Sequence, residues 1–173
     1  MFPEPKQIKL IKEEHLAKYR GDSNTIWLRS SWEIRFFKWL MNNDSVKWVN
    51  SEDVIVWYYS PKDNKRHRYL MDFVFEFETK DNILRKVMVE VKPYYQCIPP
   101  KLTKTKTGRN HKKRLDRYKK EKLVYDINIA KWKAAKEFSV KNGLFFWILT
   151  EKPGDKWASE FKIWKAEDFI KEN

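Results

Sequence analysis

Two neighbouring segments alternate apolar and polar side chains, and this alternation constrains the fold more than any other feature of the sequence. In residues 68–78 one side carries Met71, Phe73, Phe75 and Phe77, and in residues 84–92 one side carries Val87, Val89 and Val91. Such alternation is typical of β-strands. Turn-forming residues at 60–64 and 81–82 separate these segments from each other and from a β-branched, aromatic segment at 54–59. The sequence therefore predicts three strands joined as an antiparallel meander.

Two helices and a buried strand complete the predicted core. Ser30 and Ser31 can cap a helix over about 32–42, and a second helix is predicted over about 128–142, ended by Gly143. The apolar run 144–149 predicts a fully buried strand, and a short strand is predicted near 161–164. This order of elements indicates an α/β domain with helices on both sides of a central mixed sheet.

The charge of the chain is strongly positive and unevenly distributed. The net charge is +13, and residues 101–122 contain eleven Lys or Arg against two acidic residues. We expect this basic insertion to favour a polyanionic partner, because bound lysine and arginine release counterions from phosphates. One cysteine excludes a disulfide scaffold. No apolar run reaches the roughly 20 residues that span a bilayer, so no membrane partner is expected.

Four residues could form a catalytic centre. Glu90 and Lys92 are two apart in a predicted strand and point the same way. Asp72 begins the preceding strand and can lie across from Glu90, and Glu33 lies beside the apolar stripe of the first helix. Converging carboxylates repel each other, and a divalent cation such as Mg²⁺ relieves this repulsion and carries water that can attack a phosphate. A lysine beside the cation can orient that water.

The same residues also have ordinary structural explanations. A Glu and a Lys two apart on a strand often form an exposed ion pair that contributes little to stability. Asp72 could simply form a turn at the end of a strand, and Glu33 could be an acid favoured by the dipole in the first turn of its helix. Spacing alone leaves these alternatives open.

Three motifs in a fixed order carry a resemblance to a known family. They are Arg29-Ser30-Ser31-Trp32-Glu33, the run from Arg66 to Phe73, and Val89-Glu90-Val91-Lys92-Pro93. In this order they resemble the PD-(D/E)XK nuclease superfamily, its TnsA-like branch and, within that branch, the head-completion nucleases of T-even-type bacteriophages. The resemblance covers about residues 27–151 and is supported by the stretches 96–101, 128–135 and 142–151.

The resemblance implies a restriction-endonuclease-like core and a role for each candidate residue. Asp72 and Glu90 would bind Mg²⁺, for which Mn²⁺ should substitute, Glu33 would complete the site, and Lys92 would assist the attacking water. Met71 stands where the family often has proline, which is not a ligand. Residues 1–26 mix Lys, Glu and Pro with few large apolar side chains and are predicted to be a flexible tail. Residues 27–165 are then the predicted nuclease-like domain with the basic insertion 101–122, and 166–173 a predicted helical turn.

The implied function is a metal-dependent endonuclease that cleaves double-stranded DNA with little sequence preference. It would trim or finish packaged DNA before the neck joins the head, with phage portal or neck proteins as further partners, in the cytoplasm of the infected bacterium or in the virion. We expect backbone contacts from the basic insertion and the second helix, namely Lys104, Lys106, Arg109, Lys112, Lys113, Arg114 and Lys131. Two alternatives stay open: a non-catalytic neck or portal protein that binds the DNA end, and a TnsA-like transposase subunit.

Overall fold

The structure is a computed structural model that describes residues 6–7, 17–22, 26–102, 110–153 and 160–170. Its centre is a five-stranded sheet in the order β3-β6-β7-β8-β9, in which β7 and β8 are parallel and the other neighbours are antiparallel. The strands are β3 (Val46–Ser51), β6 (Phe73–Glu78), β7 (Leu84–Val91), β8 (Phe145–Glu151) and β9 (Phe161–Lys165). This mixed sheet confirms the predicted α/β class.

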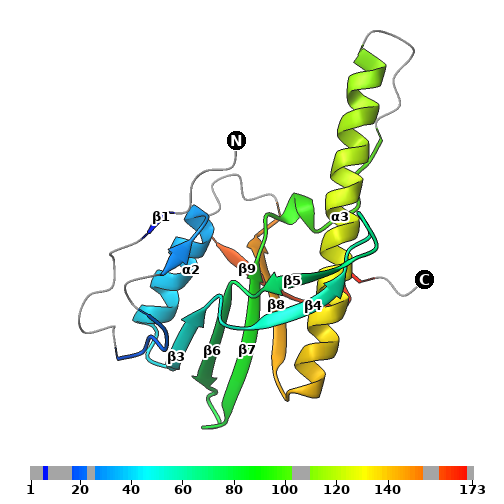
Figure 1. Ribbon diagram of the computed structural model, residues 1–173. Coiled ribbons are helices and arrows are strands. Elements are labelled where there is room, and N and C mark those ends of the chain that lie inside the picture. The colour runs from blue at the N-terminus through cyan, green and yellow to red at the C-terminus, as the bar shows by residue number, and fades with distance from the viewer. Residues whose placement is uncertain (1–5, 8–16, 23–25, 103–109, 154–159, 171–173) are drawn as a thin grey trace.

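The helices lie on opposite sides of this sheet (Figure 1). They are α2 (Ser31–Asn42) and α3 (Asn110–Lys141), with short 3₁₀ turns η1 (Tyr94–Gln96) and η2 (Ala166–Asp168). Two further two-stranded sheets pair β1 (Lys6–Gln7) with β2 (Trp27–Leu28), and β4 (Ile55–Tyr59) with β5 (Arg66–Leu70). The β4–β5 hairpin crosses α3 (Figure 1). Among the described residues, no helix combines the length and apolarity that a membrane span requires.

Each face of the sheet has its own hydrophobic core. On one side, α2 packs on β6 and β7 through Phe36, Phe37, Leu40, Met41, Phe73, Phe75, Val87 and Val89. On the other side, α3 packs on the sheet and on the β4–β5 hairpin through Trp132, Ala135, Val74, Met88, Ile148, Val56, Tyr58 and Tyr69. The predicted alternation along β6 and β7 is confirmed: Phe73, Phe75, Val87 and Val89 lie on the side of α2, and Met88 and Glu90 face the side of α3.

The strands predicted for the meander pair antiparallel in chain order, as expected, but they do not form one sheet. Residues 46–51, for which the sequence pattern predicts no strand, form β3 and take the place beside β6. The predicted strand 68–78 is interrupted at Met71 and Asp72, so β4 and β5 form a separate hairpin. The interruption occurs because the backbone of Met71 bonds Val54 and Glu52, at 3.0 and 3.1 Å, and leaves the line of β6. Met71 is accordingly buried on the side of α3, opposite to Phe73.

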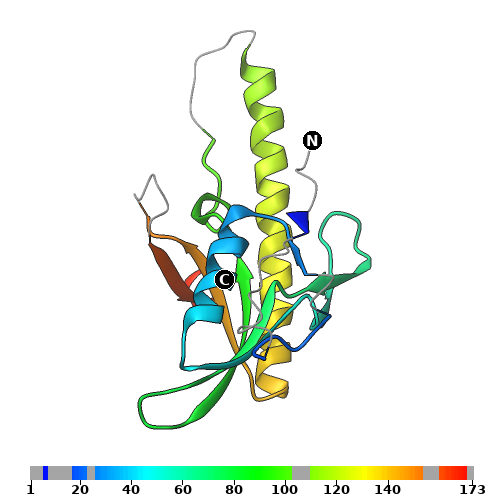
Figure 2. The same ribbon diagram turned by 90° about the vertical axis from the view of Figure 1, so that its left-hand side faces the viewer.

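The basic insertion is not a separate loop over its described part. From Asn110 onward it forms one continuous helix with the predicted second helix, 32 residues in all. Lysine, arginine and glutamate are good helix formers, and ion pairs spaced by four residues join Arg117 to Glu121 at 2.7 Å and Lys122 to Asp126 at 2.9 Å. The first turns of α3 project beyond the sheet as an arm in both views (Figures 1 and 2).

The described residues near both ends pack on the core. Tyr19 bridges to Val49 of β3, and Ile26 is 1% exposed, so a flexible tail extending to residue 26 is wrong for these residues. At the other end, η2 forms the predicted helical turn over 166–168 and buries Ala166 and Phe169 beneath α3 and β8. The packed domain therefore extends well beyond the two alternating segments, 68–78 and 84–92.

Candidate active site

The candidate site lies where β6 begins and β7 ends. The register pairs Phe73 with Val89, so Asp72, one residue before Phe73, comes beside Glu90, one residue after Val89. The backbone N–H of Val91 donates a hydrogen bond to Oδ2 of Asp72 at 2.7 Å. The sequence prediction that Asp72 lies across from Glu90 is therefore confirmed, although Asp72 occupies the interruption between two strands and not the interior of one.

Glu90 and Lys92 form an ion pair at the end of β7. Lys92 Nζ lies 2.6 Å from Oε1 of Glu90, and the two side chains are 24% and 2% exposed. The second carboxylate oxygen of Glu90, Oε2, is buried without a hydrogen-bond partner. Burial disfavours the charged form of Lys92, but Glu90 and then Asp72 outweigh burial and raise the pKa of the ammonium group. Lys92 is therefore a protonated cation at neutral pH.

Asp72 is held in an environment that disfavours its charge. Burial raises the pKa of this carboxyl well above its usual range, and the negative charge of Glu90 raises it further. Lys92 opposes this shift, while Glu33 contributes to it. An acid with these neighbours binds a cation more readily than it persists as a free carboxylate, because a cation removes the repulsion among the three acids.

Glu33 reaches the same centre from the first turn of α2. Its Oε1 accepts a hydrogen bond from the Ser30 hydroxyl and its Oε2 accepts one from the N–H of Arg29, both at 2.7 Å. The Ser30 hydroxyl also accepts from the N–H of Glu33 at 3.2 Å and so caps the helix. Glu33 is thus fixed in place, and its charge influences the pKa of both Asp72 and Lys92.

The carboxylates of Asp72, Glu90 and Glu33 are the kind of donor set that binds a hard divalent cation. Carboxylate oxygens are the ligands that Mg²⁺ prefers, and the buried unpaired Oε2 of Glu90 is an acceptor that lacks a partner. Within the described ranges, no three acidic, histidine or cysteine side chains already surround one point as metal ligands do. The carboxylates are instead directed at Lys92, Val91 and Ser30.

Two residues near Glu90 are not predicted from the sequence to belong to the site. Tyr69 of β5 and Trp132 of α3 are 3% and 0% exposed; no hydrogen bond of standard geometry from the described residues reaches the Tyr69 hydroxyl or the Trp132 ring N–H, but the hydroxyl interacts with both Glu90 and Trp132. Burial, followed by the charges of Glu90 and Asp72, raises the pKa of Tyr69 well above its usual range. Nothing in the sequence distinguishes Tyr69 and Trp132 from core residues, because buried aromatic side chains are ordinarily part of the core.

The predicted DNA-contacting residues fall into three places. Lys131 of α3 lies at the site: its Nζ is 4.9 Å from the ring centre of Tyr69, and its pKa is lowered by burial, against the influence of Glu90. Lys112, Lys113 and Arg114 are exposed on the first turns of α3. Outside the described residues lie Lys104, Lys106 and Arg109.

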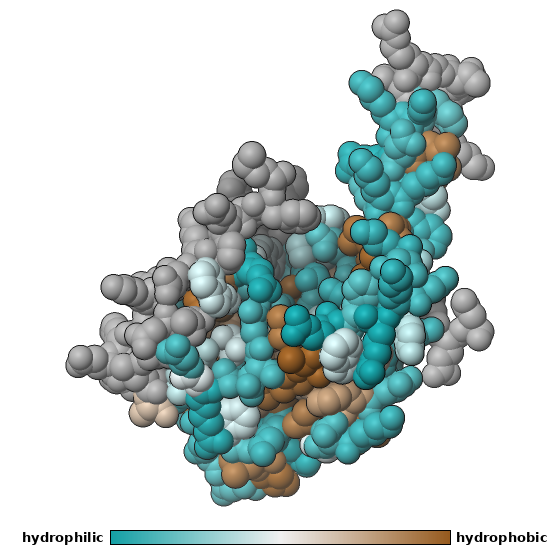
Figure 3. Space-filling view, viewed as in Figure 1, coloured by the Kyte–Doolittle hydropathy of each residue, from teal (hydrophilic) through white to brown (hydrophobic). Residues whose placement is uncertain are grey.

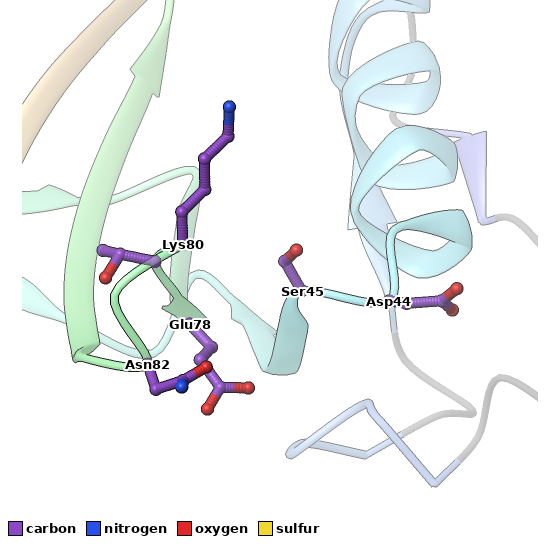
Figure 4. A pocket seen from close by; sticks show the side chains of 6 residues that line it. Asp44, Ser45, Glu78, Lys80 and Asn82 are labelled. Carbon is purple, nitrogen blue, oxygen red and sulfur yellow. The ribbon is translucent and has the colours of Figure 1, made fainter.

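A surface pocket lies elsewhere and does not belong to this centre. Its volume is about 310 Å³, and it lies at the turn between β6 and β7, the end of these strands opposite to Asp72 and Glu90 (Figure 4). Asp44, Ser45 and Glu78 line it together with the turn residues Lys80 and Asn82. Glu78 is paired with Lys47 at 2.5 Å. These separate charges do not form a second group of converging acids.

Comparison with known proteins supports the relationship that the motifs suggest. The family described as TnsA-like endonuclease N terminal matches residues 43–151, a range that contains Asp72, Glu90 and Lys92. A relative from Enterobacteria phage T4, named head completion nuclease, is 34% identical over 138 residues, which cover 80% of this chain and 87% of the relative. No solved structure matches the chain. The extent of both matches shows that the chain belongs to the TnsA-like endonuclease family.

Proposed function

We propose that the protein is a metal-dependent DNA endonuclease whose centre is formed by Asp72, Glu90, Glu33 and Lys92. The observation that carries this proposal is the buried carboxylate of Glu90, which lies beside Asp72 and forms an ion pair with Lys92. Asp72 and Glu90 would hold the cation, which we expect to be Mg²⁺ or, in substitution, Mn²⁺, and Glu33 would complete its surroundings. A bound divalent cation would polarise the phosphate and supply a nucleophilic water.

The other side chains at the centre would orient water, stabilise charge and hold the acids in place. Lys92 would donate hydrogen bonds that orient the attacking water and stabilise negative charge developing on the phosphate. Ser30 and Arg29 hold Glu33, and Val91 holds Asp72, so the acids are positioned before a substrate arrives.

The arm of α3 is the proposed contact for the DNA backbone. Its first turns carry the exposed cations Lys112, Lys113 and Arg114, and Figure 3 shows hydrophilic side chains over most of this projecting part. The preceding segment adds Lys104, Lys106 and Arg109, and Lys131 lies close enough to the acids to contact a phosphate at the site. Backbone contacts of this kind explain binding without sequence preference.

The biological setting follows from the T4 relative, whose name states head completion. We infer that this protein likewise finishes or trims packaged double-stranded DNA during joining of head and neck, in the cytoplasm of an infected bacterium or in the virion. Portal or neck proteins would then be its protein partners. The overall positive charge, +13, suits a protein that acts on the exposed end of a packaged DNA molecule.

Cleavage of supercoiled plasmid in Mg²⁺ tests the proposal. Asp72→Ala and Lys92→Ala should each lose at least about 100-fold in rate, because each removes a group required in the transition state. Asp81→Ala, in the turn at the opposite end of the hairpin, is the matched control and should cleave like the wild type. Circular dichroism checks that each variant is folded. Equal rates for all four proteins would contradict these assignments.

A complementation assay separates the enzyme from a non-catalytic DNA-end protein. Phage that carry Glu90→Ala in this gene should fail to give infectious particles if cleavage is needed. Normal virion assembly with a folded but inactive Glu90→Ala protein would instead favour the structural role.

A further inference from the structure

The outer face of the β4–β5 hairpin is the most unusual exposed surface of the described structure. The residues that point away from α3 are Ile55, Trp57, Tyr59, Arg66, Arg68 and Leu70, all of them exposed. Trp57 and Tyr59 are 48% and 71% exposed. Their strand neighbours Val56 and Tyr58 are buried against α3, so the hairpin is anchored on one side and free on the other.

Aromatic rings and arginines are paired across this face. The register places Trp57 opposite Arg68 and Tyr59 opposite Arg66. The guanidinium group of Arg66 lies over the Trp57 ring, 4.6 Å from its centre. A cation held in this way is oriented before any ligand binds, and it keeps its outer side free for a phosphate or a base.

The charge of the hairpin is complementary to a polyanion. Lys62 and Lys65 flank the turn and are exposed, which adds two cations to Arg66 and Arg68. Asp63 is the only acidic residue from 55 to 70, and its carboxylate is engaged by the ring of His67 at 3.0 Å. Within residues 55–70, all of which the structure describes, no other carboxylate opposes an anion.

The hairpin also leads directly into the proposed catalytic centre. β5 ends at Leu70, two residues before Asp72. At a rise of about 3.3 Å per residue, Arg68 lies within about 13 Å of Asp72 along the chain, and Arg66 within about 20 Å. A DNA strand of a few nucleotides could thus touch this face while its phosphate occupies the centre.

We propose that this outer face, the hairpin platform, binds an unpaired DNA strand beside the cleavage site. Bases would stack on Tyr59 and on the guanidinium of Arg66 that lies over Trp57, and phosphates would contact Arg66 and Arg68. The occupant is a single strand because the bases of an intact duplex already stack on each other and offer no free face to the rings. This inference rests on the proposed function and narrows its substrate to duplex DNA with an unpaired end or tail.

Fluorescence polarisation without divalent metal tests the platform independently of cleavage. The probes are a labelled blunt duplex and the same duplex with a single-stranded tail, added to the full chain in EDTA. We expect the wild type to bind the tailed duplex more tightly. Trp57→Ala combined with Tyr59→Ala should weaken that binding by at least about tenfold, since both aromatic rings of the stacking surface are lost. Binding of the blunt duplex should not change.

Matched control variants show whether a loss of binding comes from the hairpin face or from general damage to the protein. Trp39→Ala removes a tryptophan that is 51% exposed on α2 and should leave both probes unaffected. Tyr59→Phe retains a ring and should bind nearly as the wild type does. Arg68→Ala should weaken the tailed duplex and reduce the salt dependence of its binding. Thermal unfolding shows whether the hairpin variants are folded, and the exposure of Trp57 and Tyr59 predicts that they are.

Two outcomes would overturn the inference. Equal losses for blunt and tailed duplex would show a general DNA contact without strand preference. No loss for either probe would exclude DNA as the occupant and would favour a protein partner. The plasmid assay run in parallel keeps the two proposals separate. If the wild type cleaves and the hairpin variants bind both probes normally, only the platform is refuted. If the wild type does not cleave, the proposed function is refuted.

Discussion

Removing the positive charge beside Glu90 tests the physical basis of the site most directly. Lys92→Met keeps most of the aliphatic volume of the lysine but deletes the ammonium group whose Nζ lies 2.6 Å from Oε1 of Glu90. Glu90 is 1% exposed, so water has no ready access to replace the lost partner. Asp72 nearby adds a second acid whose repulsion is no longer offset.

The expected magnitude follows from this geometry. At 2.6 Å and an effective dielectric constant of about 20, the attraction between the two charges is about 6 kcal/mol. Part of this attraction only offsets the desolvation of Lys92, and deleting one partner of a buried pair costs about 3–5 kcal/mol. We therefore expect Lys92→Met to lower the free energy of unfolding by about 3 kcal/mol at neutral pH.

Urea unfolding in EDTA measures this loss, and two further variants define its cause. Adding Glu90→Gln to Lys92→Met should recover most of the stability, because a neutral amide needs no cation. Lys86→Met is the matched control on β7: its Nζ lies 3.9 Å from Glu76 and is exposed, so the change should stay below about 1 kcal/mol. A Lys92→Met protein as stable as this control, or a double variant no more stable than Lys92→Met, would refute the buried ion pair.

Three more predictions follow from the same centre. Burial and Glu90 raise the pKa of Asp72, so this carboxyl takes up a proton when the chain folds. The free energy of unfolding therefore falls as pH rises above about 4, the pKa of a free aspartate. Asp72→Asn should therefore be more stable than the wild type at neutral pH in EDTA, with the difference vanishing near about pH 4, as urea unfolding across pH would show. Millimolar Mg²⁺ or Mn²⁺ should raise the Tm of the wild type but not of Asp72→Asn in differential scanning fluorimetry, and equal shifts would argue against this metal site. Ser30→Ala should cost about 1 kcal/mol and slow plasmid cleavage because Glu33 loses its hydroxyl partner, whereas Ser30→Thr should preserve both.

The site could be predicted in part because three of its relationships are local. Glu90 and Lys92 share a face of β7 through the two-residue period of a strand, and Ser30 fixes Glu33 through a capping arrangement three residues long. The hairpin turn between β6 and β7 brings Asp72 near Glu90. Each relationship spans a short stretch of chain whose backbone geometry is nearly invariant.

The errors concern pairings between distant parts of the chain. Nothing within residues 54–78 says that β3 displaces β4 from the edge of β6, since that choice depends on which strand better buries the face toward α2. The length of α3 was missed for a related reason. Its first half is charged and carries no apolar stripe, so periodicity gives no helix signal there even though its residues favour helix.

The amino-acid sequence by itself determined the class of the fold, the direction of the side chains along β6 and β7, and the family, and it supplied the acids proposed for the site. Only the tertiary structure decided that Tyr69, Trp132 and Lys131 surround Glu90, and that the β4–β5 hairpin stands apart with its aromatic face outward. The reason is physical: side-chain direction follows from local backbone geometry, whereas the partners of a buried group depend on how distant segments compete to cover the sheet.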